Sequence, residues 1–400
     1  MDVSCLAPVV PDLHAEQAVL LRCARARLGP ADRELLRELL RAGLSWGRLR
    51  RLADYHGLAP LLHQHLAGCA ADLCPPDELR EWRAGAVSVL AANMRLCAEL
   101  VALVGLFRRD GIEVAAFKGP VAATAYYGHL GARTFVDLDV LVPSAQARQA
   151  CAALVRAGYA PHFPLRPGWD EVYLRRNCER VFDREVPAAK VDLHWGLLPP
   201  GYSFTPLAGE VWGRLESVRL GGVDVPTLGT DDTLLFFCLH AAKHDWASLH
   251  WLCDLTELLR TRPVVDWDWV RATAERGKAW RLVQVGLRLA RDLLDAPVPE
   301  ALLHGGREAE ALAAEAARSL LSGVERAGTR WPWRSLYYRG MERTRDRARL
   351  IHDLLLAPTV HEWGLVPLPP ALAPLYYAVR PFRLLAKGLL SEARANRANE

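Results

Sequence analysis

Apolar residues recur every three or four positions through most of the first hundred residues, which is the period of an amphipathic helix. The Pro75-Pro76 pair interrupts this pattern, because proline cannot continue a helix, and Asp77 is a suitable cap for the helix that follows. The clearest helical segments are residues 18–28, 33–53 and 87–107. We therefore predict a helical N-terminal region that spans residues 1–92.

The pattern changes after Gly111, where short apolar and β-branched runs alternate with helical ones. Short runs of this kind, bounded by turn residues, are typical of β-strands. Strands are predicted at 112–117, 135–142, 159–163, 180–184 and 188–195, and helices at 120–128 and 144–158. This order of elements predicts a small mixed sheet backed by helices, which we assign to a core of residues 93–228.

Helical periodicity returns after Gly229, where Thr230 is a suitable cap for the next helix. The predicted helices are two within residues 230–260, one at 267–277 and one at 280–295. We assign residues 229–400 to a C-terminal helical domain. The expected fold class is α+β, with a small mixed β-sheet core that is flanked by N- and C-terminal helical regions.

Length and composition limit the classes of protein to consider. A chain of 400 residues exceeds what one hydrophobic core usually holds, so two or three packed units are expected. The hydrophobic fraction of 51% excludes a disordered chain. Lys and Arg number 50 against 46 Asp and Glu, and the net charge of +4 is too small to indicate nucleic acid as a partner.

Three features predict a cytoplasmic protein without a membrane span. The nine cysteines include no CxxC pair, which favours buried thiols in a reducing compartment. The N-terminus contains Asp2 and Asp12 and no apolar segment of signal-peptide length. The apolar stretch 364–379 contains four prolines, which break a spanning helix. The oligomeric state is left open.

The run 135–142 contains two acids at alternate positions, Asp137 and Asp139. Side chains at i and i+2 of a strand share a face, so the two carboxylates point the same way. Val136, Leu138 and Val140 are then expected on the opposite, core-facing side. Adjacent carboxylates repel each other, and a divalent cation such as Mg²⁺ is the simplest compensation. The alternative is a strand end whose acids face solvent.

A third acid strengthens the metal hypothesis. Asp192 lies on the predicted strand 188–195 and shares its face with His194. Three carboxylates from two adjacent strands can hold two metal ions about 3.5–4 Å apart, which suits in-line phosphoryl transfer. We expect two Mg²⁺ ions, with Mn²⁺ as a substitute, and expect His194 to support the site by hydrogen bonding.

Residues upstream of the acids are candidates for binding phosphate. Lys118 and Gly119 end the first predicted strand and open a helix, where backbone N–H groups are available to an anion. Lys118 adds a point charge for a triphosphate. Arg133, just before the acidic strand, adds a forked guanidinium that matches phosphate geometry.

His240 and His244 lie four residues apart on a predicted helix, with Lys243 between them. This spacing places both imidazoles on one helix face, where they could bind Zn²⁺ with one further ligand. The metalloprotease pattern requires Glu after the first His, and this chain has Ala241. A second interpretation places His240 and Lys243 in a nucleotide cleft, with Lys243 near the phosphates. The third is that they are ordinary polar positions on a packed helix.

Residues 117–143, 190–197 and 239–259, which include the motifs above, resemble a poorly characterised nucleotidyltransferase family of bacterial biosynthetic clusters. That family shares the DNA polymerase β-like nucleotidyltransferase fold. The resemblance covers about residues 93–259 and implies that Asp137, Asp139 and Asp192 are metal ligands and catalytic residues. It also implies that Gly119 stands where the superfamily has a Gly-Ser turn. Here Pro120 replaces the serine, and Lys118 is the candidate substitute for the missing hydroxyl.

The leading functional hypothesis, which this resemblance implies, is a Mg²⁺-dependent nucleotidyltransferase. It would transfer a nucleoside monophosphate from an NTP, with ATP as one candidate, to a hydroxyl or phosphate on an unknown small molecule, peptide or protein. One alternative is a tailoring transferase in natural-product (peptide) biosynthesis that acts on a phosphorylated product. Another is a catalytically inactive nucleotidyltransferase-like scaffold, which the Pro120 departure leaves open.

Overall fold

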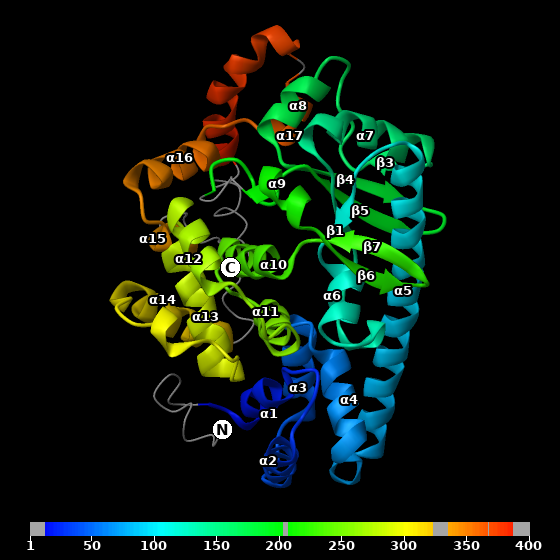
Figure 1. Ribbon diagram of the computed structural model, residues 1–400, viewed down its shortest axis with the longest axis vertical. Coiled ribbons are helices and arrows are strands. Elements are labelled where there is room, and N and C mark those ends of the chain that lie inside the picture. The colour runs from blue at the N-terminus through cyan, green and yellow to red at the C-terminus, as the bar shows by residue number, and fades with distance from the viewer. Residues whose placement is uncertain (1–12, 203–206, 323–334, 367, 387–400) are drawn as a thin grey trace, which may run out of the picture.

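Two helical regions and a small α/β layer make up the part of the chain that the computed structural model describes, residues 13–202, 207–322, 335–366 and 368–386. In Figure 1 the sheet and its helices lie at the upper right, the N-terminal helices at the bottom and the C-terminal helices on the left. The predicted α+β class, a small mixed sheet with flanking helices, is confirmed.

The central sheet has five strands in the order β1-β2-β5-β4-β3. They are β1 Ala115–Ala116, β2 Leu138–Leu141, β3 Ala160–Pro161, β4 Glu179–Arg184 and β5 Ala189–His194. β2 and β5 run parallel, and the other neighbours pair antiparallel, so the sheet is mixed as expected. All five predicted strands are present, although β1 and β3 are only two residues long.

The acidic strand is shorter than the sequence suggested. β2 begins at Leu138, so Val136 and Asp137 precede it. Leu138 and Val140 are completely buried, but Val136 is 73% exposed. The prediction that Val136 faces the core is therefore wrong, because the alternation of faces holds only within the strand and Val136 lies in the segment that enters it.

One face of the sheet is apolar and packs against two helices of the α/β layer. The central strands bury four aliphatic side chains completely, Leu138, Val140, Val191 and Leu193. The helices α5 (Pro76–Arg109) and α7 (Ala147–Arg156) pack in the same cluster through residues such as Leu100, Phe107 and Leu154. Because side chains alternate along a strand, the acidic residues between these positions face the other way.

The remaining helices cover both ends of this layer. The N-terminal ones are α1 Ala15–Cys23, α2 Pro30–Arg41, α3 Trp46–Tyr55 and α4 Ala59–Cys69. The C-terminal ones are α10 Thr230–Lys243, α11 Leu249–Thr261, α12 Trp267–Arg276, α13 Trp280–Leu294, α14 Arg307–Leu321, α15 Leu336–Gly340, α16 Thr344–Leu355 and α17 Val360–Leu365. Both sets share one hydrophobic cluster, in which Val19 and Leu36 are buried together with Leu239 and Leu287.

Helix starts and several short elements differ from the sequence prediction. α5 is capped by Pro75 and α10 by Gly229, so the predicted caps Asp77 and Thr230 lie inside the first turn. The sequence patterns missed the two-stranded sheet of β6 Glu216–Leu220 and β7 Val223–Thr227, and the helices α8 Asp170–Arg176 and α9 Leu207–Glu210. The helix α6 Gly119–Ala125 was predicted.

Among the described helices, α5 is long and apolar enough to cross a membrane by length and composition. A single such helix is weak evidence, because the core helix of a globular protein meets the same criterion. The eight described cysteines are free thiols, and Cys5 lies outside the described residues. The cytoplasmic location stays a prediction.

Candidate active site

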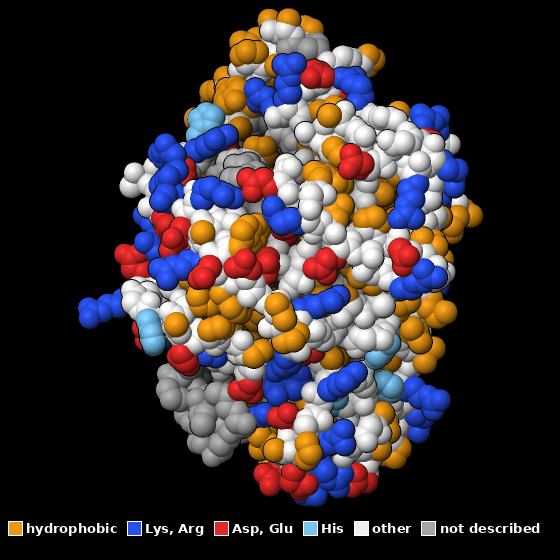
Figure 2. Space-filling model, viewed as in Figure 1, with side chains coloured by type: hydrophobic (Ala, Val, Ile, Leu, Met, Phe, Trp, Pro, Cys, Tyr) orange, Lys and Arg blue, Asp and Glu red, His pale blue; other side chains and the backbone are white. Residues whose placement is uncertain are grey.

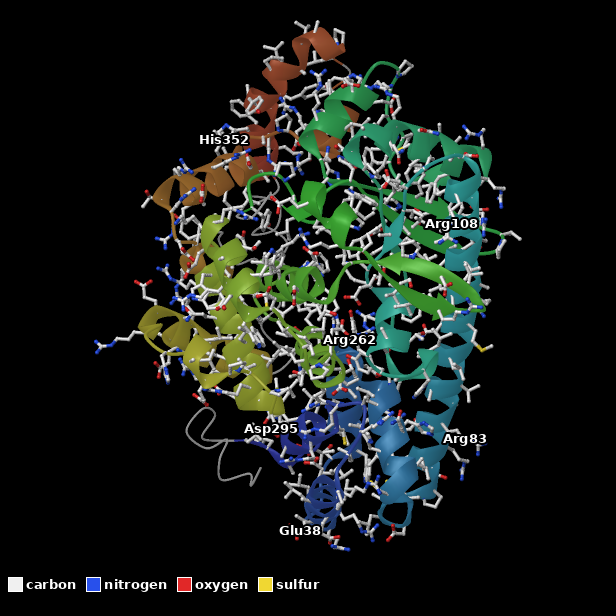
Figure 3. All side chains as sticks on the ribbon, viewed as in Figure 1. Glu38, Arg83, Arg108, Arg262, Asp295 and His352 are labelled. Carbon is white, nitrogen blue, oxygen red and sulfur yellow. The ribbon has the colours of Figure 1, made fainter. Side chains whose placement is uncertain are left out.

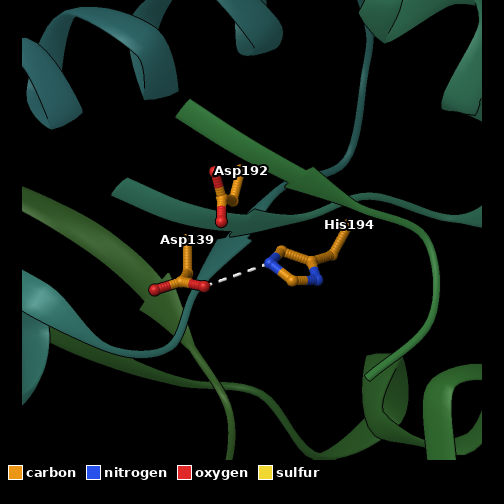
Figure 4. Close-up of side chains that lie close together, drawn as sticks. All are labelled: Asp139, Asp192 and His194. Atoms are coloured by element: carbon orange, nitrogen blue, oxygen red, sulfur yellow. Dashed lines mark hydrogen bonds and ion pairs between the residues drawn. The ribbon is translucent and has the colours of Figure 1, made fainter. Parts of the chain in front are cut away.

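The parallel pairing of β2 and β5 brings two of the predicted acids together. In this register Asp139 lies directly opposite Asp192. His194, two residues further along β5, points to the same side, and Figure 4 shows the three side chains converging. One potential ligand atom from each of the three lies within 4.8 Å of the other two. Residues 53 positions apart in the sequence thus form one compact group of metal-ligand type.

Asp137 lines the same cavity but is not part of that compact group. It lies just before β2, where the chain has not yet entered the sheet. Burial, and then the charge of Asp139, raise the pKa of the Asp137 carboxyl above its usual value. The carboxylates of Asp137 and Asp139 are therefore close enough to interact, as their spacing predicted.

Asp139 is the most strongly held of the acids. Its Oδ1 accepts hydrogen bonds from Lys118 Nζ at 2.7 Å and from His194 Nε2 at 3.1 Å. Burial alone favours the neutral carboxyl, but the Lys118 ammonium and the His194 contact outweigh it and hold the pKa of Asp139 well below its usual range. Asp139 is therefore ionised, and the predicted phosphate-binding Lys118 is its ion-pair partner.

Asp192 is in the opposite electrostatic situation. Its Oδ1 is buried and has no hydrogen-bond partner among the described residues. Burial, followed by the charges of Asp139 and Asp137, raises the pKa of Asp192 to about 6. Glu179 of β4, whose Oε2 lies 3.2 Å from His194 Nδ1, adds a further negative charge near Asp192, which His194 partly offsets. The negative charge around Asp192 is thus only partly compensated.

Gly119 fits closely between the acids and the start of α6. Its φ of +49° lies in the left-handed region, which glycine adopts at little cost. A Cβ here would lie 3.5 Å from the carbonyl oxygen of Asp137 and 3.7 Å from the ring of Phe135. The glycine therefore lets the chain turn tightly behind the acidic group and orient Lys118 toward Asp139.

A cavity of about 430 Å³ surrounds these groups, and three separate parts of the chain line it. The α/β layer contributes the acids together with Lys118, Gly119 and Glu179. The helical regions contribute Asp54, Tyr55 and Gly57 from the α3–α4 corner, and Phe236, His240, Lys243, His244, His250 and Trp251 from α10 and α11. The sequence patterns did not indicate Asp54, Tyr55, His250 or Trp251, because no local motif links them to the acids.

Arg133 lines the cavity, but its guanidinium is already paired. It donates to both carboxylate oxygens of Asp254 on α11, with Nε–Oδ1 at 2.8 Å and Nη2–Oδ2 at 2.7 Å. Tyr127 Oη donates to the same carboxylate at 2.8 Å. Both charged side chains are buried. The guanidinium therefore links the entry to β2 with α11, in addition to lining the cavity.

The predicted histidine pair forms part of an aromatic wall. The rings of His240 and His244 lie 4.9 Å apart, and His244 stacks on Trp251 at 4.8 Å. Burial, and then nearby cations, lower the pKa of His244 to about 4 and that of His240 well below its usual value. Both imidazoles are therefore neutral. Within the described residues no third ligand completes a metal group with them.

The geometry agrees with a comparison to known families. A family model described as an uncharacterised nucleotidyltransferase matches residues 42–295, more than half of the chain. The chain belongs to this family. Among curated proteins, none matches the chain at a significant level. The matched span contains every residue that lines the cavity, including those from α3 and α11. This nucleotidyltransferase is therefore a transferase, and its family segment extends beyond residues 93–259, where the resemblance was first seen.

Proposed function

We propose that this nucleotidyltransferase transfers a nucleoside monophosphate from an NTP to an acceptor hydroxyl or phosphate, with Mg²⁺ as its cofactor. The observation that carries the proposal is the pairing of Asp139 with Asp192 on neighbouring parallel strands inside the cavity. Asp137 adds a third carboxylate, and Lys118 and Lys243 add two cations to the same cavity.

The donor set fits a hard divalent ion. Carboxylate oxygens are the ligands that Mg²⁺ and Mn²⁺ prefer. The partnerless Oδ1 of Asp192 and its raised pKa indicate a negative site that lacks a counter-charge. Asp139 and Asp192 would hold one ion, and Asp137 would join them for a second. Bound ions would stabilise the charge that develops on the transferred phosphate and on the leaving pyrophosphate.

Lys118 and Lys243 are proposed to bind the triphosphate. Only five of the 50 basic residues are lysines, and two of these five line the cavity. Lys243 makes no ion pair with any described residue, so its charge is available to an anion. The Lys118 ammonium forms an ion pair with Asp139. When a metal ion binds the Asp139 carboxylate instead, the Lys118 ammonium can turn to a phosphate oxygen. Arg133 is assigned a positioning role, because Asp254 already occupies its guanidinium.

Asp192 is the proposed base for a hydroxyl acceptor. The acceptor oxygen attacks the α-phosphorus, the bond to the β-phosphate breaks, and pyrophosphate leaves with that bond's electrons. The hydroxyl proton goes to Asp192, whose Oδ1 has no hydrogen-bond partner among the described residues and is free to accept it. A phosphate acceptor needs no base, so the two acceptor classes differ in their dependence on Asp192.

The test is incubation with each α-³²P-labelled NTP, Mg²⁺ or Mn²⁺, and a panel of hydroxyl-bearing and phosphorylated acceptors, including peptides. The wild type is compared with Asp139→Asn and with Asp268→Asn, which changes an exposed acid on α12. We expect label transfer by the wild type and the control, and a loss of about a thousandfold or more in Asp139→Asn. Undiminished transfer by Asp139→Asn would refute the assignment.

The same assay separates the two alternatives. A tailoring transferase would label only the phosphorylated acceptors. An inactive scaffold would bind NTP in the presence of metal without any turnover. The structure gives the scaffold one supporting observation, the Lys118–Asp139 ion pair, which occupies one of the proposed metal-ligand oxygens.

A further inference from the structure

The long helix α5 carries a second regular apolar pattern, most of which the fold does not use. Ala84, Ala91 and Ala98 are seven residues apart, and an apolar residue follows each of them three positions later. These following residues are Val87, Met94 and Val101. Alternate steps of three and four residues mark the contact seam of a coiled coil. We call these six positions the α5 seam.

Five of the six positions of the α5 seam are exposed, and Val101 is half-buried and packs against the core. Val87 is 60% and Met94 57% exposed, and the adjacent Leu90 is 39% exposed. The opposite face of α5 is the one that packs in the core, through residues such as Leu100 and Phe107. Figure 2 shows hydrophobic side chains along the right-hand edge of the molecule, where Figure 1 places α5.

Much of the apolar stretch of α5 is left exposed. The most apolar stretch of α5 has a mean hydropathy of 1.7 over 18 residues, and only 33% of it is buried. Single exposed apolar side chains are ordinary, but a contiguous apolar strip marks an interaction surface. Arg83 and Arg108, which Figure 3 labels, mark the course of α5 along this edge of the molecule.

We infer that two copies of this chain associate through their α5 helices, which pair antiparallel about a two-fold axis. In such an interface the same surface is used twice, and residue i of one copy meets residue j of the other reciprocally. The sequence of the α5 seam supports this arrangement in two independent ways, through side-chain size and through charge.

Side-chain size favours one antiparallel register. If Ala91 of one copy faces Met94 of the other, then Val87 faces Ala98 and Ala84 faces Val101. Every layer then pairs a small residue with a larger one, so the helices can approach closely and still fill the space between them. A parallel pair would place Met94 against Met94 and Ala91 against Ala91, with alternate crowding and gaps.

Charge favours the same arrangement. The first turn of α5 contains Asp77 and Glu78, and its last turn contains Arg108 and Arg109. In the antiparallel register Asp77 faces Arg108 of the second copy, at both ends of the interface. The two helix dipoles are also opposed, which is the favourable orientation. A parallel pair would bring like charges together at each end.

The first test is the mass of the full-length protein by analytical ultracentrifugation over a range of concentrations. We expect about twice 44.4 kDa for the wild type, and at least about a hundredfold weaker association for Met94→Glu, which buries a charge at the centre of the seam. The matched control is Val155→Lys, which adds a charge at a 53% exposed position on α7. It should associate as the wild type does, and circular dichroism melts confirm that both variants fold.

The second test fixes the register by disulfide trapping. In the double variant Val87→Cys/Ala98→Cys, each new thiol meets its counterpart on the second copy, so oxidation should give a covalent dimer. The out-of-register control, Val87→Cys/Met94→Cys, should give no more covalent dimer than the wild type. The existing described cysteines are buried, apart from the half-buried Cys69.

Three results would overturn the inference. The first is a monomer at every concentration. The second is equal loss of association in Val155→Lys and Met94→Glu, which would place the interface elsewhere. The third is a monomer that binds lipid vesicles through Met94, which would identify a membrane as the occupant. None of these measurements depends on catalysis, so they test the inference independently of the proposed function.

Discussion

Single residues set the electrostatic balance of the candidate site. Asp139 has two hydrogen-bond donors on one oxygen, whereas Asp192 directly opposite has none on its Oδ1. The two carboxyls accordingly shift in opposite directions, with the pKa of Asp139 lowered and that of Asp192 raised to about 6. The Lys118 ammonium compensates one negative charge and leaves the other for a ligand.

Asp192 gives a pH prediction that follows from this balance. Its pKa is about 6 in the folded protein against an ordinary value of 3.8, so the folded state binds more protons between these values. The contribution of Asp192 to the free energy of unfolding therefore falls as pH rises from about 4 to 6. The full loss, at most about 3 kcal/mol, persists at higher pH. Asp192→Asn should be more stable than the wild type at pH 8 in EDTA.

The measurement is urea denaturation at pH 4, 6 and 8, in EDTA and in Mg²⁺. Mg²⁺ should stabilise the wild type at pH 8 and leave Asp192→Asn unchanged, because binding relieves the repulsion that the substitution has already removed. Asp268→Asn serves as the surface control. Lower stability of Asp192→Asn than of the wild type in EDTA at pH 8 would contradict the electrostatic account.

At the scale of elements, a buried charge pair fixes the approach to the acidic strand. Arg133, in the segment before β2, is paired with Asp254 of α11, and the same carboxylate accepts a hydrogen bond from Tyr127, just after α6. α11 also carries His250 and Trp251 into the cavity. The position of the cavity wall and that of β2 are therefore coupled.

Removing one partner of this pair should be costly. Asp254→Ala is expected to destabilise the protein by about 3–5 kcal/mol, because it leaves the Arg133 guanidinium buried without a counter-charge. Replacing both partners, as Arg133→Met/Asp254→Leu, should cost clearly less. Urea denaturation of the two variants and of Arg133→Met completes the comparison. A cost below about 1 kcal/mol for Asp254→Ala would show that the pair is not structurally important.

Periodicity predicted which elements exist better than where they end. The 3.6-residue period predicted the long helices, and the alternation around Asp139 and Asp192 predicted the two central strands. The sequence did not show that β2 begins only at Leu138, because strand ends depend on which backbone groups find a partner in the neighbouring strand. It also missed the hairpin of β6 and β7, although the Gly221-Gly222 pair that joins the two strands is a local hairpin signal.

At the scale of the whole molecule, the α/β layer is not packed separately from the helices. Phe117, at the end of the first predicted strand, contacts Phe236 of α10 edge-to-face with ring centroids 5.0 Å apart. Tyr126, at the end of α6, contacts Phe237 in the same way. We therefore propose that residues 1–92, 93–228 and 229–400 are regions of the sequence that fold together.

A fragment of residues 93–228 should accordingly fail to fold alone. Without α10 it exposes Phe117 and Tyr126, which are buried in the full chain, and we expect it to bind the dye ANS and to melt without a cooperative transition. The full chain, measured under the same conditions, should show a cooperative transition. If calorimetry showed that the fragment melts cooperatively, the α/β layer would be an independent domain.

The sequence by itself determined the helical regions, the small sheet, and the candidate acids Asp137, Asp139 and Asp192. These features depend on neighbouring residues, whose spacing fixes which side chains share a face. The tertiary structure alone decided that Asp139 lies opposite Asp192 and that Lys118 pairs with Asp139. It also decided that helices distant in the sequence line the cavity. Such contacts depend on how the whole chain buries its apolar surface, and no local pattern encodes that choice.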